Sequence, residues 1–240
     1  MDTRSHRVLP IVALTTLLIV VAFAPGWAEN NGKHQNGEGK YANLTALWEV
    51  WAFSQPAVDI EGTNTNPVLD STGAFAAAGQ ENGIGPGNKY FFLAGTFGGT
   101  AVRTVTVPAG KALFFPVIAG NWDNAVDPPP PTPYTVPELR AQAKASADSI
   151  TAVSATLNGE PLEVFRTKSP VFDYTLPSEN SLYEYFGLVG PQFEGRVNPS
   201  VADGYWVFIP PLPAGDYTLA FAGANSSGFN VNVTYYLTIE

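Results

Sequence analysis

The C-terminal stretch from Val231 to Ile239 alternates strictly: every second residue is large and apolar, and the residues between them are Asn, Thr or Tyr. A period of two residues is typical of a β-strand with one buried and one exposed face. Residues 216–222 show the same alternation, and a glycine-bearing turn at 223–228 connects the two stretches. We therefore expect them to pair as neighbouring strands above a hydrophobic core.

Short β-rich runs, separated by Gly- and Pro-bearing turns, occur through much of the remaining chain. They comprise residues 89–94, 101–107, 111–118, 153–157, 161–165 and 205–209. Asn158-Gly159 is a good hairpin signal, because a type I′ turn needs positive φ at both central positions. The sequence therefore predicts a mainly β fold, a single antiparallel β-sandwich that is jelly-roll-like, with no second domain boundary in residues 42–240.

Two segments have helical periodicity, and we expect both helices at the periphery of the sandwich. In residues 43–54 apolar side chains recur at helical spacing, Asn43 stands at the capping position and Pro56 follows the end. The other side of this helix is also apolar, so it should be mostly covered, and its two tryptophans fit core packing better than sugar stacking. The second helix starts with a capping box formed by Thr135 and Glu138.

The N-terminal segment has the features of a secretory signal peptide: a short basic start, an apolar run at 8–24 and small residues before Glu29. A retained membrane anchor is the alternative, but the apolar run is short for a bilayer span. We predict an exported protein, periplasmic or extracellular, with no stable membrane span after cleavage. Its parts are a signal peptide at 1–28, a flexible tether at 29–41 and the β-sandwich at 42–240.

Composition excludes several classes of function. The net charge of −9 opposes nucleic-acid binding, which needs clustered basic side chains, so we predict no nucleic-acid partner. The chain has no cysteine, which excludes a thiol nucleophile and a cysteine-ligated zinc site. After the signal segment the one histidine is His34, in the tether, which argues against a Ser-His-Asp triad or a histidine-ligated metal.

Several motifs follow one another along the chain. They are Trp48-x-x-Trp51, Asn66-Pro67-x-x-Asp70-x-Thr72-Gly73, Gly79-Gln80, Phe92–Gly95, Arg103, Val107–Pro116, Ser169-Pro170-x-Phe172, Ala202–Tyr205 and Pro211-Leu212-x-x-Gly215. In this combination the chain, from about Leu47 to its end, resembles an uncharacterised family of exported bacterial β-proteins. The resemblance implies no activity. Similar proteins place cysteines at the positions of Ala76 and Val105, so we expect these two residues to lie close together.

Carboxylates are the catalytic groups that this composition leaves. Glycoside hydrolysis needs two of them on opposite sides of the glycosidic bond, about 5 to 10 Å apart. The candidates near aromatic residues are Asp70, Asp123, Asp127, Asp173, Glu184 and Asp203. Nothing in the sequence pairs them, and scattered surface acids are the commoner interpretation, so we assign no catalytic residue. Arg103 is expected to pair with an acid such as Asp70 or Asp203, because a partly buried charge needs a partner.

The segment 121–127 gathers oxygen-bearing side chains. Asn121, Asp123, Asn124 and Asp127 supply the ligand chemistry that calcium prefers, so they are the candidate calcium ligands. The segment lacks the glycine and the terminal glutamate of an EF-hand loop, and Asn and Asp are also favoured in turns. Apart from this calcium ion, no cofactor is expected.

Four aromatic residues are candidates for binding a ligand: Trp122 and Tyr134, and in a second group Tyr183 and Tyr185. Flat aromatic faces beside Asn and Asp suit sugar rings. The alternative is that these rings cap the ends of the sandwich core.

These observations favour an exported, non-enzymatic binding or envelope-associated domain, with a glycan or another envelope component as partner. The alternatives are a carboxylate-dependent glycan-active enzyme and a structural or assembly module that pairs through a sheet edge. Two facing acids in a deep aromatic cleft would favour the enzyme. An aromatic groove without such a pair would favour binding, and a long exposed apolar edge strand would favour assembly.

Overall fold

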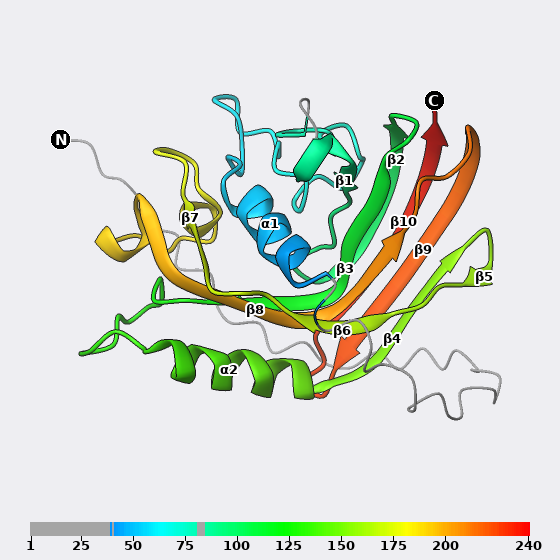
Figure 1. Ribbon diagram of the computed structural model, residues 1–240. Coiled ribbons are helices and arrows are strands. Elements are labelled where there is room, and N and C mark those ends of the chain that lie inside the picture. Colours follow the sequence, from blue (N-terminus) through cyan, green and yellow to red (C-terminus); the bar gives the residue numbers. More distant parts are fainter. Residues whose placement is uncertain (1–38, 40, 81–84) are drawn as a thin grey trace, which may run out of the picture. The chain divides into compact units, whose positions relative to one another are not determined.

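The computed structural model describes residue 39 and residues 41–80 and 85–240. In this part of the chain the strands form two sheets that pack together (Figure 1). The first sheet has the order β1-β3-β8-β6, with β7 also on β8, and the second has the order β2-β10-β9-β4-β5. The strands are β1 Tyr90–Phe92, β2 Gly99–Val107, β3 Ala112–Trp122, β4 Ile150–Leu157, β5 Glu160–Pro161, β6 Phe165–Lys168, β7 Phe172–Thr175, β8 Arg196–Ile209, β9 Gly215–Asn225 and β10 Asn230–Ile239.

The prediction of a mainly β, sandwich-like fold is confirmed, but both sheets are mixed rather than purely antiparallel. β1 is parallel to β3, because the chain leaves β1, forms β2 in the second sheet and returns as β3. β10 runs parallel to β2 and antiparallel to β9, so that Tyr235 lies opposite both Arg103 and Leu219. Alternation identifies a strand but not its neighbours, and therefore gives no pairing direction.

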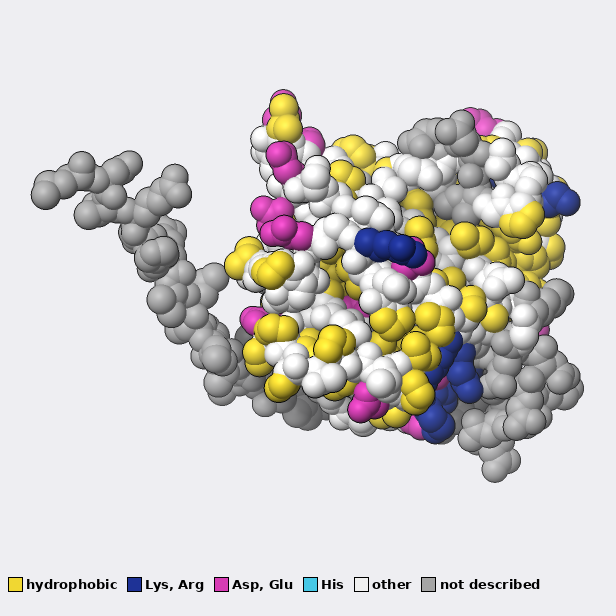
Figure 2. Space-filling model, turned by 60° about the vertical axis from the view of Figure 1, so that its left-hand side comes forward, with side chains coloured by type: hydrophobic (Ala, Val, Ile, Leu, Met, Phe, Trp, Pro, Cys, Tyr) yellow, Lys and Arg dark blue, Asp and Glu magenta, His cyan; other side chains and the backbone are white. Residues whose placement is uncertain are grey.

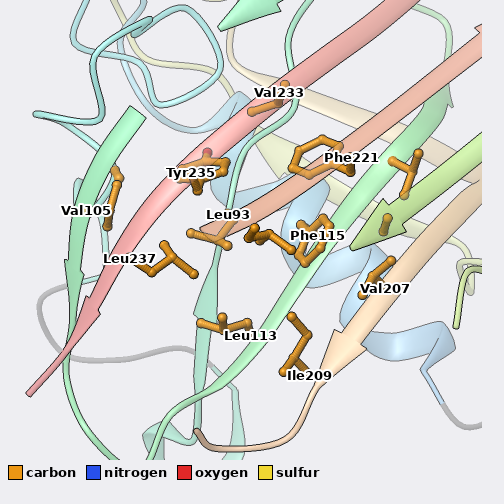
Figure 3. Packing of buried hydrophobic residues seen from close by; sticks show 14 of the residues in the cluster. Leu93, Val105, Leu113, Phe115, Val207, Ile209, Phe221, Val233, Tyr235 and Leu237 are labelled. Atoms are coloured by element: carbon orange, nitrogen blue, oxygen red, sulfur yellow. The ribbon is translucent and has the colours of Figure 1, made fainter. Parts of the chain in front are cut away.

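The main hydrophobic core lies between the two sheets (Figure 3). As the alternation predicted, the apolar residues of β10 are buried there: Val231, Val233, Tyr235, Leu237 and Ile239. Opposite them lie residues of the first sheet, and Phe115 of β3 packs against Phe221 of β9 with 4.8 Å between ring centroids. Burying a large apolar side chain contributes about 1.5–3 kcal/mol, so this cluster dominates the stability of the sandwich.

The other face of the first sheet is covered by helix α1 (Ala42–Phe53) (Figure 1). Trp48 and Trp51 pack there with Phe92, Phe114 and Trp206. The indole N–H groups of Trp48 and Trp51 donate hydrogen bonds to the backbone oxygens of the sheet and of the preceding loop. The expected core role of both tryptophans is confirmed, and α1 forms a covered layer instead of a peripheral helix.

Two further helices complete the fold. Helix α2 (Val136–Asp148) has the predicted capping box and packs Leu139 and Ala143 against Val201 of β8. Helix α3 (Leu182–Tyr185) is a single turn for which we had identified no sequence signal. Short 3-10 turns occupy Pro86–Asn88 and Pro191–Phe193. The Asn158-Gly159 hairpin is confirmed, with φ of 51° and 86°.

Arg103 is buried in β2, and its five N–H groups are all used. They donate to the backbone oxygens of four residues and to the Tyr235 hydroxyl; the four residues are Val68, Asp70, Ala94 and Gly95. The carboxylate of Asp70 instead accepts from its own loop, and Asp203 pairs with Arg166. The expected pairing with an acid side chain is therefore wrong, because backbone carbonyls satisfy the guanidinium.

Ala76 and Val105 are buried in the same hydrophobic cluster between the sheets. The Thr104 N–H donates to the backbone oxygen of Thr72, 2.9 Å away, so the two segments lie side by side. The expected proximity of Ala76 and Val105 stays a prediction, which their shared cluster supports.

The predicted signal peptide and most of the predicted tether lie outside the described residues. Tyr41, assigned to the tether, stacks on Phe165 and Phe208 with 4.9 and 4.8 Å between ring centroids. The packed domain therefore includes Tyr41. No helix in the described ranges has the length and apolar character needed to span a membrane.

Candidate functional site

A cavity of about 200 Å³ lies between α1 and the first sheet. Its wall is formed by α1, by the connection from β1 to β2, by the middle of β3 and by the start of β10. The lining residues are Trp48, Glu49, Ala52, Phe53, Val68, Gly95, Thr96, Phe97, Pro116, Val117, Ile118, Ala119, Gly120, Asn121, Phe229 and Val231. Most of them are apolar and none of them is basic. The lining residues with polar side chains are Glu49, Thr96 and Asn121.

Glu49 is enclosed because α1 is covered on several sides. It lies between Trp48 and Val50 on a helix that packs into the fold, and its exposed fraction is 2 %. Burial, together with the smaller effect of the nearby charge of Asp123, raises the pKa of Glu49 to about 8. No hydrogen bond to its carboxyl group is seen among the described residues. At neutral pH it is therefore mainly an uncharged acid that faces a cavity.

Asp123, just after β3, is the second buried acid near this cavity, and its oxygens are occupied. Oδ2 accepts from the Tyr174 hydroxyl at 2.7 Å, from the Tyr183 hydroxyl at 3.2 Å and from Asn121 Nδ2 at 2.9 Å. Oδ1 accepts from the Ala125 N–H at 2.8 Å. Burial raises the pKa of Asp123 although these hydrogen bonds favour its charged form. All four donors are neutral, so the acid pair has no positive counter-charge among them.

Two polar atoms on the cavity wall have no partner in the described part of the protein: Thr96 Oγ1 and Asn121 Oδ1. A buried polar atom without a hydrogen bond costs about 1–3 kcal/mol, so such atoms are rare unless water or a ligand satisfies them. With the Glu49 carboxyl group they make three hydrogen-bonding positions on an apolar wall. This is the arrangement that small-molecule sites use for orientation.

The mouth of the cavity is aromatic. Phe97 and Phe229 line the cavity and are 46 % and 39 % exposed, whereas Glu49 is 2 % exposed, so the two rings form the solvent-facing part of the wall and Glu49 belongs to its buried part. Phe97 packs edge-on against Phe186, which in turn contacts Tyr185. Figure 2 shows one face of the molecule, on which hydrophobic side chains are exposed in several groups. Exposed rings beside an opening are typical of a ligand entrance.

A second cavity of about 220 Å³ shares Ile118, Ala119, Gly120 and Phe229 with the first. Its acid, Asp203, is held by two hydrogen bonds from Arg166 at 2.9 and 2.8 Å. Since that charge is already neutralised, the second cavity offers a weaker anchor for a ligand.

The four candidate calcium ligands do not converge on one point through free oxygens. Asp123 is saturated as described, and Asn121 donates to it. Asn124 forms a reciprocal pair with the backbone of Tyr134. No group of three or more His, Cys, Asp or Glu suited to a metal occurs in the ranges that the structure describes. No hydrogen bond or ion pair of the Asp127 carboxylate is seen in the part of the chain that the structure describes, and the calcium site stays a prediction that this geometry does not support.

The predicted aromatic residues divide into two groups. Trp122 and Tyr134 pack against the cluster under α2. Tyr183 is packed with Phe53 and Phe193, and its hydroxyl faces Tyr174 and Asp123. Tyr185 is exposed, next to Phe186. Tyr185 therefore belongs to the aromatic mouth, whereas the other rings fill the fold.

The remaining candidate acids are not brought together, although Asp70 is buried rather than at the surface. Asp70 holds its own loop, Asp173 pairs with Arg196, and Glu184 accepts from the Asn180 N–H near α3. The residue that sequence reasoning missed is Glu49. It is the one charged residue of α1. The signal that could have identified it is an acid in a helix whose apolar residues indicate that every side is covered.

Comparison of the chain with protein-family models, with curated proteins and with solved structures gives no match. The resemblance to exported bacterial β-proteins therefore stays a prediction, and function has to be argued from the cavity.

Proposed function

We propose that this protein is an exported, non-enzymatic binding domain that holds a small ligand in the cavity beside Glu49. The observation that carries the proposal is the set of unpartnered polar groups on an apolar wall: the Glu49 carboxyl group, Thr96 Oγ1 and Asn121 Oδ1. A ligand that hydrogen-bonds to them would remove the cost of leaving them unpaired. The signal-peptide features of residues 1–28 support export.

The cavity limits the size of the ligand. Its volume of about 200 Å³ exceeds the roughly 150 Å³ that accommodates benzene and is below the roughly 300 Å³ where drug-sized sites begin. A ligand, or the end of a longer one, of about one ring fits these limits. A terminal sugar of an envelope glycan is one such group, since Trp48 and Phe97 offer apolar faces for its C–H surface.

The two alternatives have less support. A glycoside hydrolase needs a second carboxylate facing the substrate, whereas Asp123 does not line the cavity and uses both oxygens inside the protein. Assembly through a sheet edge needs free backbone groups; in the second sheet β5 has only two residues, and the Thr104 N–H of β2 is already used by the backbone oxygen of Thr72. A single acid on the wall of an aromatic-lined cavity favours binding.

The test is a ligand-observed NMR screen of the purified protein against small polar compounds, including monosaccharides. We expect at least one compound to bind. Thr96→Val should lower the affinity for that compound by a few-fold up to about tenfold, because one hydrogen bond is lost. The same substitution should not lower the free energy of unfolding, because the hydroxyl has no partner in the fold.

Thr106→Val is the matched control, since Thr106 is exposed on β2 and away from the cavity wall. It should leave binding unchanged. A screen without any binder, or a binder equally tolerant of both substitutions, would contradict the proposed site.

A further inference from the structure

We propose that the ligand of this cavity is a small organic ammonium ion, with its charge at Glu49 and its apolar body between the aromatic walls. The inference rests on the proposed function and narrows it to one chemical class. Three observations support it: the uncompensated acid pair, the rings that surround the cavity and the unpartnered acceptors on its wall.

The charged and titratable groups around Glu49 leave a place for a cation. Asp123 lies behind it, and the hydroxyls of Tyr174 and Tyr183, from β7 and α3, are bonded to Asp123. Arg103 reaches the cavity wall at the backbone oxygens of Val68 and Gly95. Its N–H groups are all committed to carbonyls and to the Tyr235 hydroxyl. Among the described residues no basic side chain lines the cavity near these two acids, and a bound ammonium would supply the positive charge.

The walls fit an organic cation rather than a bare metal ion. Trp48, Phe53, Phe97 and Phe229 line the cavity. Aromatic faces attract cations, most strongly when the site is desolvated. A metal ion would need several oxygen ligands, whereas the wall offers three polar side chains among apolar ones. An anionic ligand would be repelled by Asp123.

The remaining polar atoms suit an N–H donor. Thr96 Oγ1 and Asn121 Oδ1 are acceptors without partners in the described residues. An alkylammonium group has three N–H donors, enough for both atoms and for a Glu49 oxygen. Binding then releases one proton from the Glu49 carboxylic acid to solvent, so that the carboxylate and the ammonium form a neutral pair.

The test uses three probes of the same shape: neopentylammonium, neopentyl alcohol and pivalate. Calorimetry near pH 7 in buffers of different ionisation enthalpy gives both affinity and the number of protons released. We expect neopentylammonium to bind at least about tenfold more tightly than the alcohol, with pivalate not binding and close to one proton released. The proton count needs only the wild-type protein.

Glu49→Gln should lower the affinity for neopentylammonium by about tenfold or more and abolish proton release. The affinity for the alcohol should stay within about twofold. Glu61→Gln, at an exposed acid, is the matched control and should change neither value.

The outcomes separate the two proposals. If the alcohol or a monosaccharide binds as tightly as the ammonium, or if no proton is released, the ammonium inference is wrong while the cavity remains a binding site. If no probe of any charge and no compound of the screen binds, both proposals fail.

Discussion

Glu49 combines two properties that each destabilise a folded domain. Its carboxyl group is desolvated, which is costly, and it has no hydrogen-bond partner among the described residues. The protein tolerates it by keeping the group protonated at neutral pH, which avoids the larger cost of a buried charge. A residue of this kind adds little to stability, so a role in binding is the physical reason we infer for its presence.

The pH dependence of stability follows from this residue. The pKa of Glu49 is about 8 when folded and near 4.5 when unfolded, so the folded state holds one more proton between these values. The extra proton favours the folded state. This contribution to the free energy of unfolding is fully present below about pH 4.5 and is lost as the pH rises through about 8. Between about pH 5 and 9, the unfolding free energy of the wild type should fall by a few kcal/mol relative to Glu49→Gln.

Urea denaturation of both proteins at about pH 5, 7 and 9 measures this difference. Asp123 is present in both proteins, so its own raised pKa, which acts with the same sign, largely cancels in the comparison. Parallel stability curves for the wild type and the variant would show that Glu49 ionises normally.

At the scale of the element, the connection from α1 to β1 is held by specific polar side chains. Asn66 Nδ2 donates to the backbone oxygens of Ala52 and Gln55. Gln80 bonds the backbone of Phe92 through both its amide nitrogen and its oxygen. These motif residues fix the loop on the sheet and thereby position α1, with Glu49, over β3. The motifs thus explain the architecture of the site rather than its chemistry.

Gly73 offers a test of this fixation. Its φ is +92°, and a Cβ atom there would lie 2.6 Å from the Thr104 backbone oxygen. Gly159, with φ of +86°, has nothing within 4 Å of such an atom. Both Gly→Ala changes incur the cost of a positive φ, but only Gly73→Ala adds a clash with backbone.

Gly73→Ala should therefore lower the free energy of unfolding by about 1–3 kcal/mol more than Gly159→Ala. Thermal or urea denaturation of the two variants compares them directly. Equal losses would mean that the loop at 72–76 is free to move away from β2.

At the scale of the whole molecule, the first sheet belongs to two cores at once. Its residues Leu113 and Phe115 face the second sheet, and Phe114 between them faces α1. Because the same strands carry both clusters, loosening one layer disturbs the other. The described elements belong to one compact unit, which fits a single cooperative structure.

Two probes can separate these layers during unfolding. Trp48, Trp51 and Trp206 lie in the α1 layer, so tryptophan fluorescence reports mainly on that side, while far-UV circular dichroism reports on both sheets. We expect coincident urea midpoints from the two signals. A fluorescence transition at distinctly lower urea would mean that α1 detaches first and that the cavity opens by local unfolding.

The sequence by itself determined most of the strands, the two long helices, the capping box of Thr135 and Glu138 and the inward face of β10, but it missed β7 and the first part of β8. These features depend on local periodicity, capping chemistry and turn conformations, which neighbouring residues in the chain specify. It also proposed Tyr185 as a ligand-binding aromatic residue, a prediction for which the structure shows only that the ring is exposed, and it indicated that acids would be the groups left for chemistry.

Only the tertiary structure decided the parallel pairings, the backbone partners of Arg103 and the site itself. Glu49, Thr96 and Asn121 lie in α1, after β1 and in β3, and the sequence contains no periodicity that relates them. Whether a polar atom is buried, paired or left facing a cavity depends on which elements pack around it. Desolvation is a property of the packed chain, so an acid with a pKa near 8 has no signature in one dimension.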